Sequence, residues 1–144
     1  MNIVVYIALI AVLAVASIID VKTRLVPLWV IALCVGIWIW GQSIGALPID
    51  AISGLLAAAV LGGALTAATC IAERRSTEFV LGGGDIKLLA CVALFLGLYN
   101  VLWCLFGACV LALIWSGITH QHVFAFVPSI AISTTAMLAV VTLA

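Results

Sequence analysis

Two aspartates are the residues of this sequence that could do chemistry. Asp85 directly follows three consecutive glycines and begins an apolar segment, and Asp20 ends the first apolar run of the chain. An ionisable side chain at a helix centre in the bilayer costs roughly 2.5–3.5 kcal/mol, so each acid is a candidate functional residue. Two aspartates at the ends of apolar runs, in a chain with so few charges, indicate acid–base chemistry at a membrane surface.

Two carboxyl groups that share one site have a specific reactivity. Because neighbouring carboxylates cannot both ionise easily, one of them keeps its proton. The charged group can take a proton from water while the neutral group polarises a peptide carbonyl. This is aspartic-protease chemistry, which needs neither a metal nor a cofactor. Each acid alone also has an ordinary explanation. Asp85 would cap a helix after a glycine turn, and Asp20 would be solvated at the end of its span.

The three glycines before Asp85 are unusual at the start of an apolar segment, since glycine costs about 1 kcal/mol against alanine in a helix. Their benefit is backbone freedom, because glycine reaches positive φ and allows another chain to approach without a Cβ in the way. We therefore expect a supporting loop, against which a substrate can lie, formed by Gly82, Gly83 and Gly84.

The composition places the chain in a membrane. Of its 144 residues, 68% are hydrophobic and 7% are charged, a balance that leaves a soluble domain too few polar groups to cover its surface. The formal net charge is zero, which indicates no nucleic-acid partner. The five cysteines lie in apolar runs without CxxC spacing, and His120 and His122 alone make a poor metal site, so we expect no metal and no cofactor.

The lengths of the apolar runs predict an all-α, polytopic membrane bundle. A membrane helix needs about 20 largely apolar residues. The run from 86 to 118 is too long for one span, so we expect a turn near Tyr99 and Asn100. The whole chain, 1–144, is expected to form a single membrane-embedded domain. The six predicted spans cover residues 2–20, 27–45, 51–72, 86–99, 101–118 and 123–143.

The distribution of cations predicts the orientation. All five Lys and Arg residues fall at the first and third connections, which the positive-inside rule assigns to the cytoplasm. With six spans, both aspartates lie at the cytoplasmic face and both termini on the non-cytoplasmic side. No cation precedes the first apolar run, so we expect that run to be a retained span rather than a cleaved signal peptide.

Two stretches resemble the type IV prepilin leader peptidases, a family of bacterial membrane aspartic proteases. GGGDIKLL, residues 82–89, is similar to the family's GxGD signature, and DVKTRLVP, residues 20–27, is similar to its other acidic motif. FAFVP, residues 124–128, is a weaker likeness to the motif that opens the last span. The resemblance implies that Asp20 and Asp85 are the catalytic pair.

The resemblance also implies a substrate and a location. It predicts an endopeptidase of the bacterial inner membrane that cleaves the basic leader from prepilin or pseudopilin precursors, in type IV pilus assembly or protein secretion. The chain departs from the family pattern where Leu28 replaces an Asn, and where Ala125 and Val127 replace a Pro and a Gly. The cytoplasmic insert with paired CxxC motifs of larger members is absent, so the chain resembles the short form. The N-methyltransferase activity of those members stays open.

Other residues near the aspartates are candidate contacts for substrate or lipid headgroups. Lys87 is expected to extend to the headgroups rather than take part in the chemistry. The four candidate contacts are Lys22, Arg24, Pro27 and Lys87. The sequence does not predict an oligomeric state.

Three alternatives compete with the peptidase interpretation. A small proton-coupled carrier would use Asp20 and Asp85 as relay groups, and it predicts acids near the bilayer midplane. Proteases of the presenilin or signal-peptide-peptidase type carry Tyr-Asp and Pro-Ala-Leu motifs, whereas this chain has Ile19 before Asp20 and no Pro-Ala-Leu. A purely structural subunit would not explain why three glycines precede Asp85. The separation of the two aspartates is therefore the decisive geometry.

Overall fold

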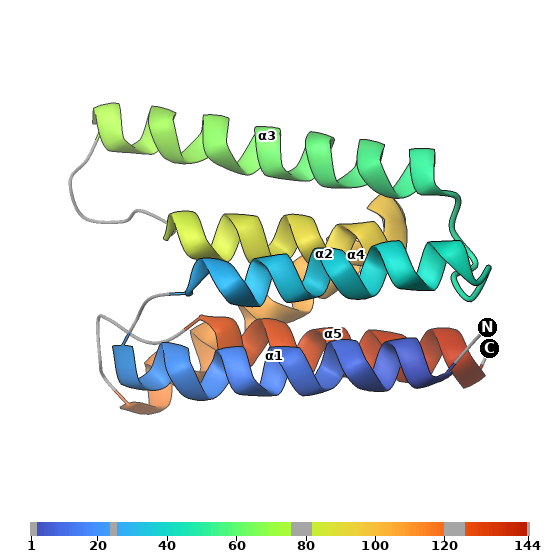
Figure 1. Cartoon of the computed structure of the whole chain (residues 1–144). Coiled ribbons are helices and arrows are strands. Elements are labelled where there is room, and N and C mark those ends of the chain that lie inside the picture. The colour runs from blue at the N-terminus through green and yellow to red at the C-terminus, as the bar shows by residue number, and fades with distance from the viewer. Residues whose placement is uncertain (1–2, 24–25, 76–81, 120–125, 144) are drawn as a thin grey trace.

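The described part of the protein is all-helical. The computed structural model describes residues 3–23, 26–75, 82–119 and 126–143, and within them it forms helices joined by short connections (Figure 1). The helices consist of α1 (Ile3–Thr23), α2 (Leu28–Ser43), α3 (Ala51–Arg75), α4 (Gly83–Thr119) and α5 (Val127–Leu143).

Length and apolar composition explain these elements. Ile3–Thr23, Ala51–Arg74 and Gly83–Ile118 are each long and apolar enough to cross a membrane, while α2 and α5 are shorter apolar helices. Large apolar side chains stay on the outside, such as Ile52 and Leu113, each 73% exposed. A helix that is apolar all round is typical of a membrane span, whose outer face contacts lipid. The all-helical prediction is confirmed, whereas the count of six spans stays a prediction.

The helix ends are sorted into two groups. The C-terminal ends of α1 and α3 lie with the N-terminal ends of α2, α4 and α5 at one end of the bundle, on the left in Figure 1. We call this the aspartate end, because Asp20 is in the last turn of α1 and Asp85 in the first turn of α4. The start of α1 and the end of α5 lie at the opposite end. That this opposite end is non-cytoplasmic stays a prediction.

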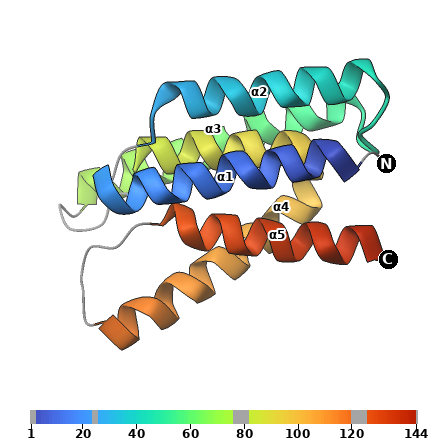
Figure 2. The ribbon, with the colours of Figure 1, turned by 60° about the horizontal axis from the view of Figure 1, so that its bottom comes forward.

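The helix α4 is broken in its middle, at a different residue from the one expected. Gly97 is non-helical, with φ 72° and ψ 174°, whereas Tyr99 and Asn100 are helical. The predicted interruption of this apolar run is therefore present, but it lies at Gly97, two to three residues before the expected Tyr99 and Asn100. The break divides α4 into a first arm (83–96) and a second arm (98–119). The physical reason is that positive φ is cheap only for glycine. Figures 1 and 2 show that the second arm runs back obliquely toward the end of the bundle at which the first arm begins.

Side chains satisfy backbone carbonyls next to this break. The indole Nε1–H of Trp38, on α2, donates to the Leu94 carbonyl at 3.1 Å, and the Asn100 side-chain amide donates to the Leu96 carbonyl at 3.1 Å. A Cβ on Gly54 would lie 2.8 Å from the same Leu94 oxygen, so α3 approaches the break at a position where only glycine fits. An unpaired carbonyl in a lipid environment costs several kcal/mol, so these contacts make the break tolerable.

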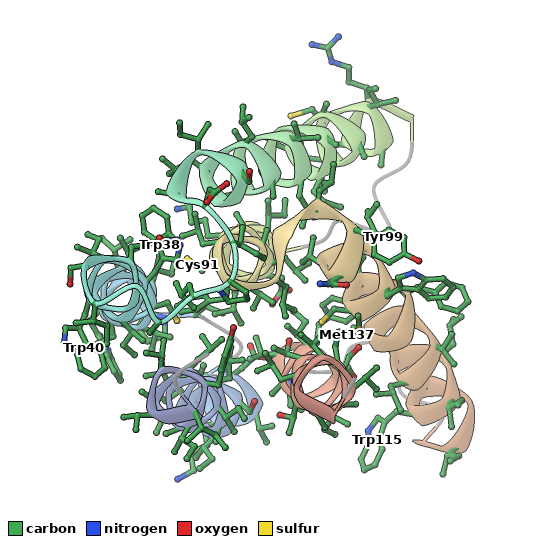
Figure 3. All side chains as sticks on the ribbon, turned by 90° about the vertical axis from the view of Figure 1, so that its right-hand side faces the viewer. Trp38, Trp40, Cys91, Tyr99, Trp115 and Met137 are labelled. Carbon is green, nitrogen blue, oxygen red and sulfur yellow. The ribbon has the colours of Figure 1, made fainter. Side chains whose placement is uncertain are left out.

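The Trp38 bond gives a stability prediction. Trp38→Phe should lower the free energy of unfolding by about 1–3 kcal/mol, because the buried Leu94 carbonyl loses a donor while the aromatic packing is largely kept. Trp40→Phe is the matched control on the same helix, since Trp40 is 47% exposed and lies on the outside of the bundle in Figure 3. We expect it to change the free energy by less than about 0.5 kcal/mol. Unfolding in mixed detergent micelles measures both, and equal losses would contradict the role of the Trp38 bond.

The first arm of α4 is the centre of the core. It packs with α2 and α3, and α4 also contacts α5, which in turn contacts α1 (Figure 3). Leu88, Leu89, Val92 and Ala93 on this arm are each 0% exposed. The arm that carries Asp85 in its first turn is therefore held from several sides.

Candidate active site

Asp20 is a buried carboxylate at the aspartate end. It continues the buried stripe of α1 that runs through Leu9, Leu13 and Ala16, and it is only 5% exposed. Its Oδ2 accepts a hydrogen bond from the backbone N–H of Val127, the first residue of α5, at 3.2 Å. A buried charge needs such a partner, because burial removes its hydration. The ordinary alternative of a solvated Asp20 does not fit this position.

Asp85 lies in the first turn of α4, where its carboxyl group folds back over the helix start. The Gly82 carbonyl accepts the N–H groups of Asp85 at 2.9 Å and Ile86 at 3.2 Å, so Gly82 is the N-cap residue. A Cβ built on Gly82 would lie 3.1 Å from Asp85 Oδ2. The side chain is half-buried rather than fully exposed. The helix start favours an acid at this place, because its free N–H groups carry partial positive charge.

The fold brings the two acids within electrostatic range of each other. The Asp85 carboxyl interacts electrostatically with Asp20, although 64 residues lie between the two acids in the sequence. The helices that carry the two acids, α1 and α4, both pack against α5, which connects them. Two carboxyl groups that interact in this way favour a state in which only one is ionised. The arrangement can therefore hold one proton-accepting and one proton-donating group.

The three glycines before Asp85 do not contribute through unusual backbone conformations. Positive φ occurs at Gly45 and Gly97 among the described glycines, so Gly82, Gly83 and Gly84 do not use the positive φ that glycine makes available. The reason is that α4 begins at Gly83, and its first residues adopt the right-handed helical conformation.

The value of these glycines is instead their missing Cβ. A Cβ on Gly84 would lie 2.9 Å from the Val26 Cβ, in the segment before α2, and a Cβ on Gly82 would meet the Asp85 carboxylate. A Cβ on Gly83 would find no atom within 4 Å. The close approach that we expected of a substrate is made here by the chain itself. The two tight positions are the first and third of the GxGD pattern, and the open one is its variable position.

The other candidate contacts are spread around this end. Lys22 and Lys87 are exposed, and Pro27 is half-buried, with its carbonyl accepting the Val30 N–H at 3.1 Å at the start of α2. Arg24 lies outside the described residues, as do both histidines. No group of three or more His, Cys, Asp or Glu side chains that could hold a metal occurs in the described part of the chain.

Sequence reasoning missed two contacts of the site. The Val127 N–H donates to Asp20, and Val26 of the 20–27 motif packs against Gly84 of the 82–89 motif. Neither valine has a side chain that signals chemistry. The faint likeness of residues 124–128 to a family motif, with Pro128 near a helix start, was the available signal for Val127.

Fold and site together define the class of protein: a bundle of apolar helices, several long enough to cross a membrane, with two interacting acids at one end. The sequence model of the type IV leader peptidase family matches residues 7–117, a stretch that includes both aspartates. The chain belongs to the type IV leader peptidase family, so it is a membrane protease. No curated protein and no solved structure matches the chain.

Proposed function

We propose that this protein is an aspartic endopeptidase that removes the basic leader peptide from type IV prepilin-like precursors at the cytoplasmic face of the bacterial inner membrane. The observation that carries the proposal is the electrostatic interaction of Asp85 with the buried Asp20 at one end of the bundle. Membership of the leader peptidase family supports the substrate class.

The two carboxyl groups divide the hydrolysis between them. The ionised aspartate takes a proton from water as the water oxygen attacks the scissile carbonyl, while the protonated aspartate donates a hydrogen bond to the carbonyl oxygen. When the tetrahedral intermediate breaks down, the C–N bond cleaves and the leaving amine accepts a proton from the acid that formed in the first step. The products are the leader carboxylate and the new N-terminal amine.

Charge supports the cytoplasmic assignment of this end. Lys22 in the last turn of α1, Arg74 in the last turn of α3 and Lys87 near the start of α4 are exposed at the aspartate end. Cytoplasmic connections of membrane proteins carry an excess of such cations. The position of the acids at helix ends, rather than in the middle of long helices, favours hydrolysis over the proton-carrier alternative.

The test is cleavage by the purified protein in liposomes. The substrate is a precursor with a basic leader followed by an apolar helix, and mass spectrometry identifies the new N-terminus. We expect a single cut at the end of the leader, with an equal rate when EDTA is present, because the proposed mechanism uses no metal. Intact precursor together with a proton flux across the liposome membrane would overturn the proposal in favour of a carrier.

A further inference from the structure

We infer that the N-terminus of α5 selects Asp20 as the aspartate that stays ionised, with the Val127 backbone N–H as the positioning group, so that Asp20 is the base and Asp85 carries the proton. This inference rests on the proposed function. It assigns different roles to two residues that the sequence alone cannot distinguish.

The hydrogen bond between Val127 and Asp20 favours one protonation state of Asp20. Val127 N donates to Asp20 Oδ2 at 3.2 Å, and Val127 is 0% exposed, so water does not compete for this donor. A hydrogen bond to an ionised acceptor is roughly twice as strong as one to a neutral acceptor. The contact therefore favours the ionised form of Asp20 over its protonated form.

The Val127 N–H lies at the start of α5. The Phe126 carbonyl accepts the N–H groups of Ser129 at 3.1 Å and Ile130 at 3.2 Å, so Phe126 is the N-cap residue and Val127 is the first helical residue. The first N–H groups of a helix have no partner within the helix and carry its partial positive charge. Pro128, the next residue, has no N–H, and the Val127 N–H donates out of the helix to Asp20.

Asp85 differs from Asp20 in this respect. No residue in the described part of the chain donates a hydrogen bond to the Asp85 carboxylate. Its negative charge is stabilised by the partial positive charge at the N-terminus of α4. A directed N–H bond to a charged group stabilises that charge more than a helix terminus usually stabilises an acid in its first turn. The proton of the pair is therefore expected on Asp85.

Few other charges face Asp20 in the described residues. The helix α5 has no ionisable side chain, and α2 contributes only the buried thiol of Cys34. The first arm of α4 contributes Asp85, the exposed Lys87 and the buried thiol of Cys91, and α1 itself contributes the exposed Lys22. The Val127 N–H is thus a directed, buried contact of Asp20 to which Asp85 has no counterpart in the described residues.

Removing the N–H tests the inference. Val127→Pro deletes it and suits the first position of a helix, where proline is common and the preceding N-cap residue is usually extended. Val127→Ala is the matched control, since it keeps the N–H and loses part of the buried side chain. The readout is the pH dependence of kcat/KM for precursor cleavage, whose acid limb reports the essential base of the free enzyme.

We expect the acid limb of Val127→Pro to move to higher pH by about one unit, because an unsupported Asp20 carboxylate forms only at higher pH. In Val127→Ala the limb should stay in place while the rate falls at every pH. An unshifted limb in a cleaving, folded Val127→Pro protein would overturn the inference and leave the proposed function intact. Absence of cleavage by the wild-type protein would instead refute the proposed function.

A second variant decides the question if Val127→Pro does not fold. Replacing Val127 by its α-hydroxy analogue converts the 126–127 peptide bond to an ester, which deletes the N–H and keeps the side chain. The same shift of the acid limb supports the inference, and an unchanged limb overturns it.

Discussion

Asp20→Asn and Asp85→Asn should each lower the rate of leader cleavage by about a thousandfold. Asparagine has nearly the same shape as aspartate, but it neither takes a proton from water nor gives one to the leaving amine. The loss should appear in kcat, measured on the precursor in liposomes, with little change in precursor binding. Because an asparagine oxygen can still accept the Val127 N–H, Asp20→Asn should keep the buried contact and fold normally.

A matched acid controls for the charge change. Asp50 is exposed at the opposite end of the bundle, where its carbonyl accepts the Gly54 N–H at 3.0 Å at the start of α3. Asp50→Asn should leave the cleavage rate within about twofold, since asparagine serves a helix start as well as aspartate does. Wild-type cleavage by either the Asp20 or the Asp85 variant would show that the pair is not the catalytic machinery.

Gly84→Ala should reduce cleavage by about a hundredfold, whereas Gly83→Ala should leave it nearly unchanged. The new methyl at position 84 would lie 2.9 Å from the Val26 Cβ, closer than carbon atoms can approach, so the start of α4 must shift. Asp85 is the next residue, and a displacement of about 1 Å in a catalytic group can cost about a hundredfold in rate. A methyl at position 83 meets nothing within 4 Å.

The size and cause of the Gly84 effect can be checked separately. Overpacking at this contact should lower the free energy of unfolding by about 1–3 kcal/mol, measured in mixed micelles. Adding Val26→Gly to Gly84→Ala removes the Val26 Cβ and should restore part of the lost rate, which a double-mutant cycle quantifies. If the two alanine variants cleave at equal rates, the contact between the start of α4 and Val26 does not determine the position of Asp85.

The sequence by itself determined the class of fold and the two acids. Uncharged runs of sufficient length predict membrane helices because the free energy of transfer to lipid is summed over a short segment. Asp20 and Asp85 were identified because placing a charge beside an apolar run costs free energy, so such a residue is a candidate functional residue. Their common side followed from counting the spans between them, and the structure places them at one end of the bundle.

The tertiary structure decided which atoms of the chain approach each other. The break of α4 at Gly97, rather than at Asn100, depends on a positive φ that no hydropathy pattern encodes, and a Cβ there would lie 3.1 Å from Ile49 Cδ1. The bond between the Val127 N–H and Asp20 joins residues 107 positions apart. Such contacts depend on how whole helices pack, whereas hydropathy and capping signals act within a few turns, so only the folded bundle determines them.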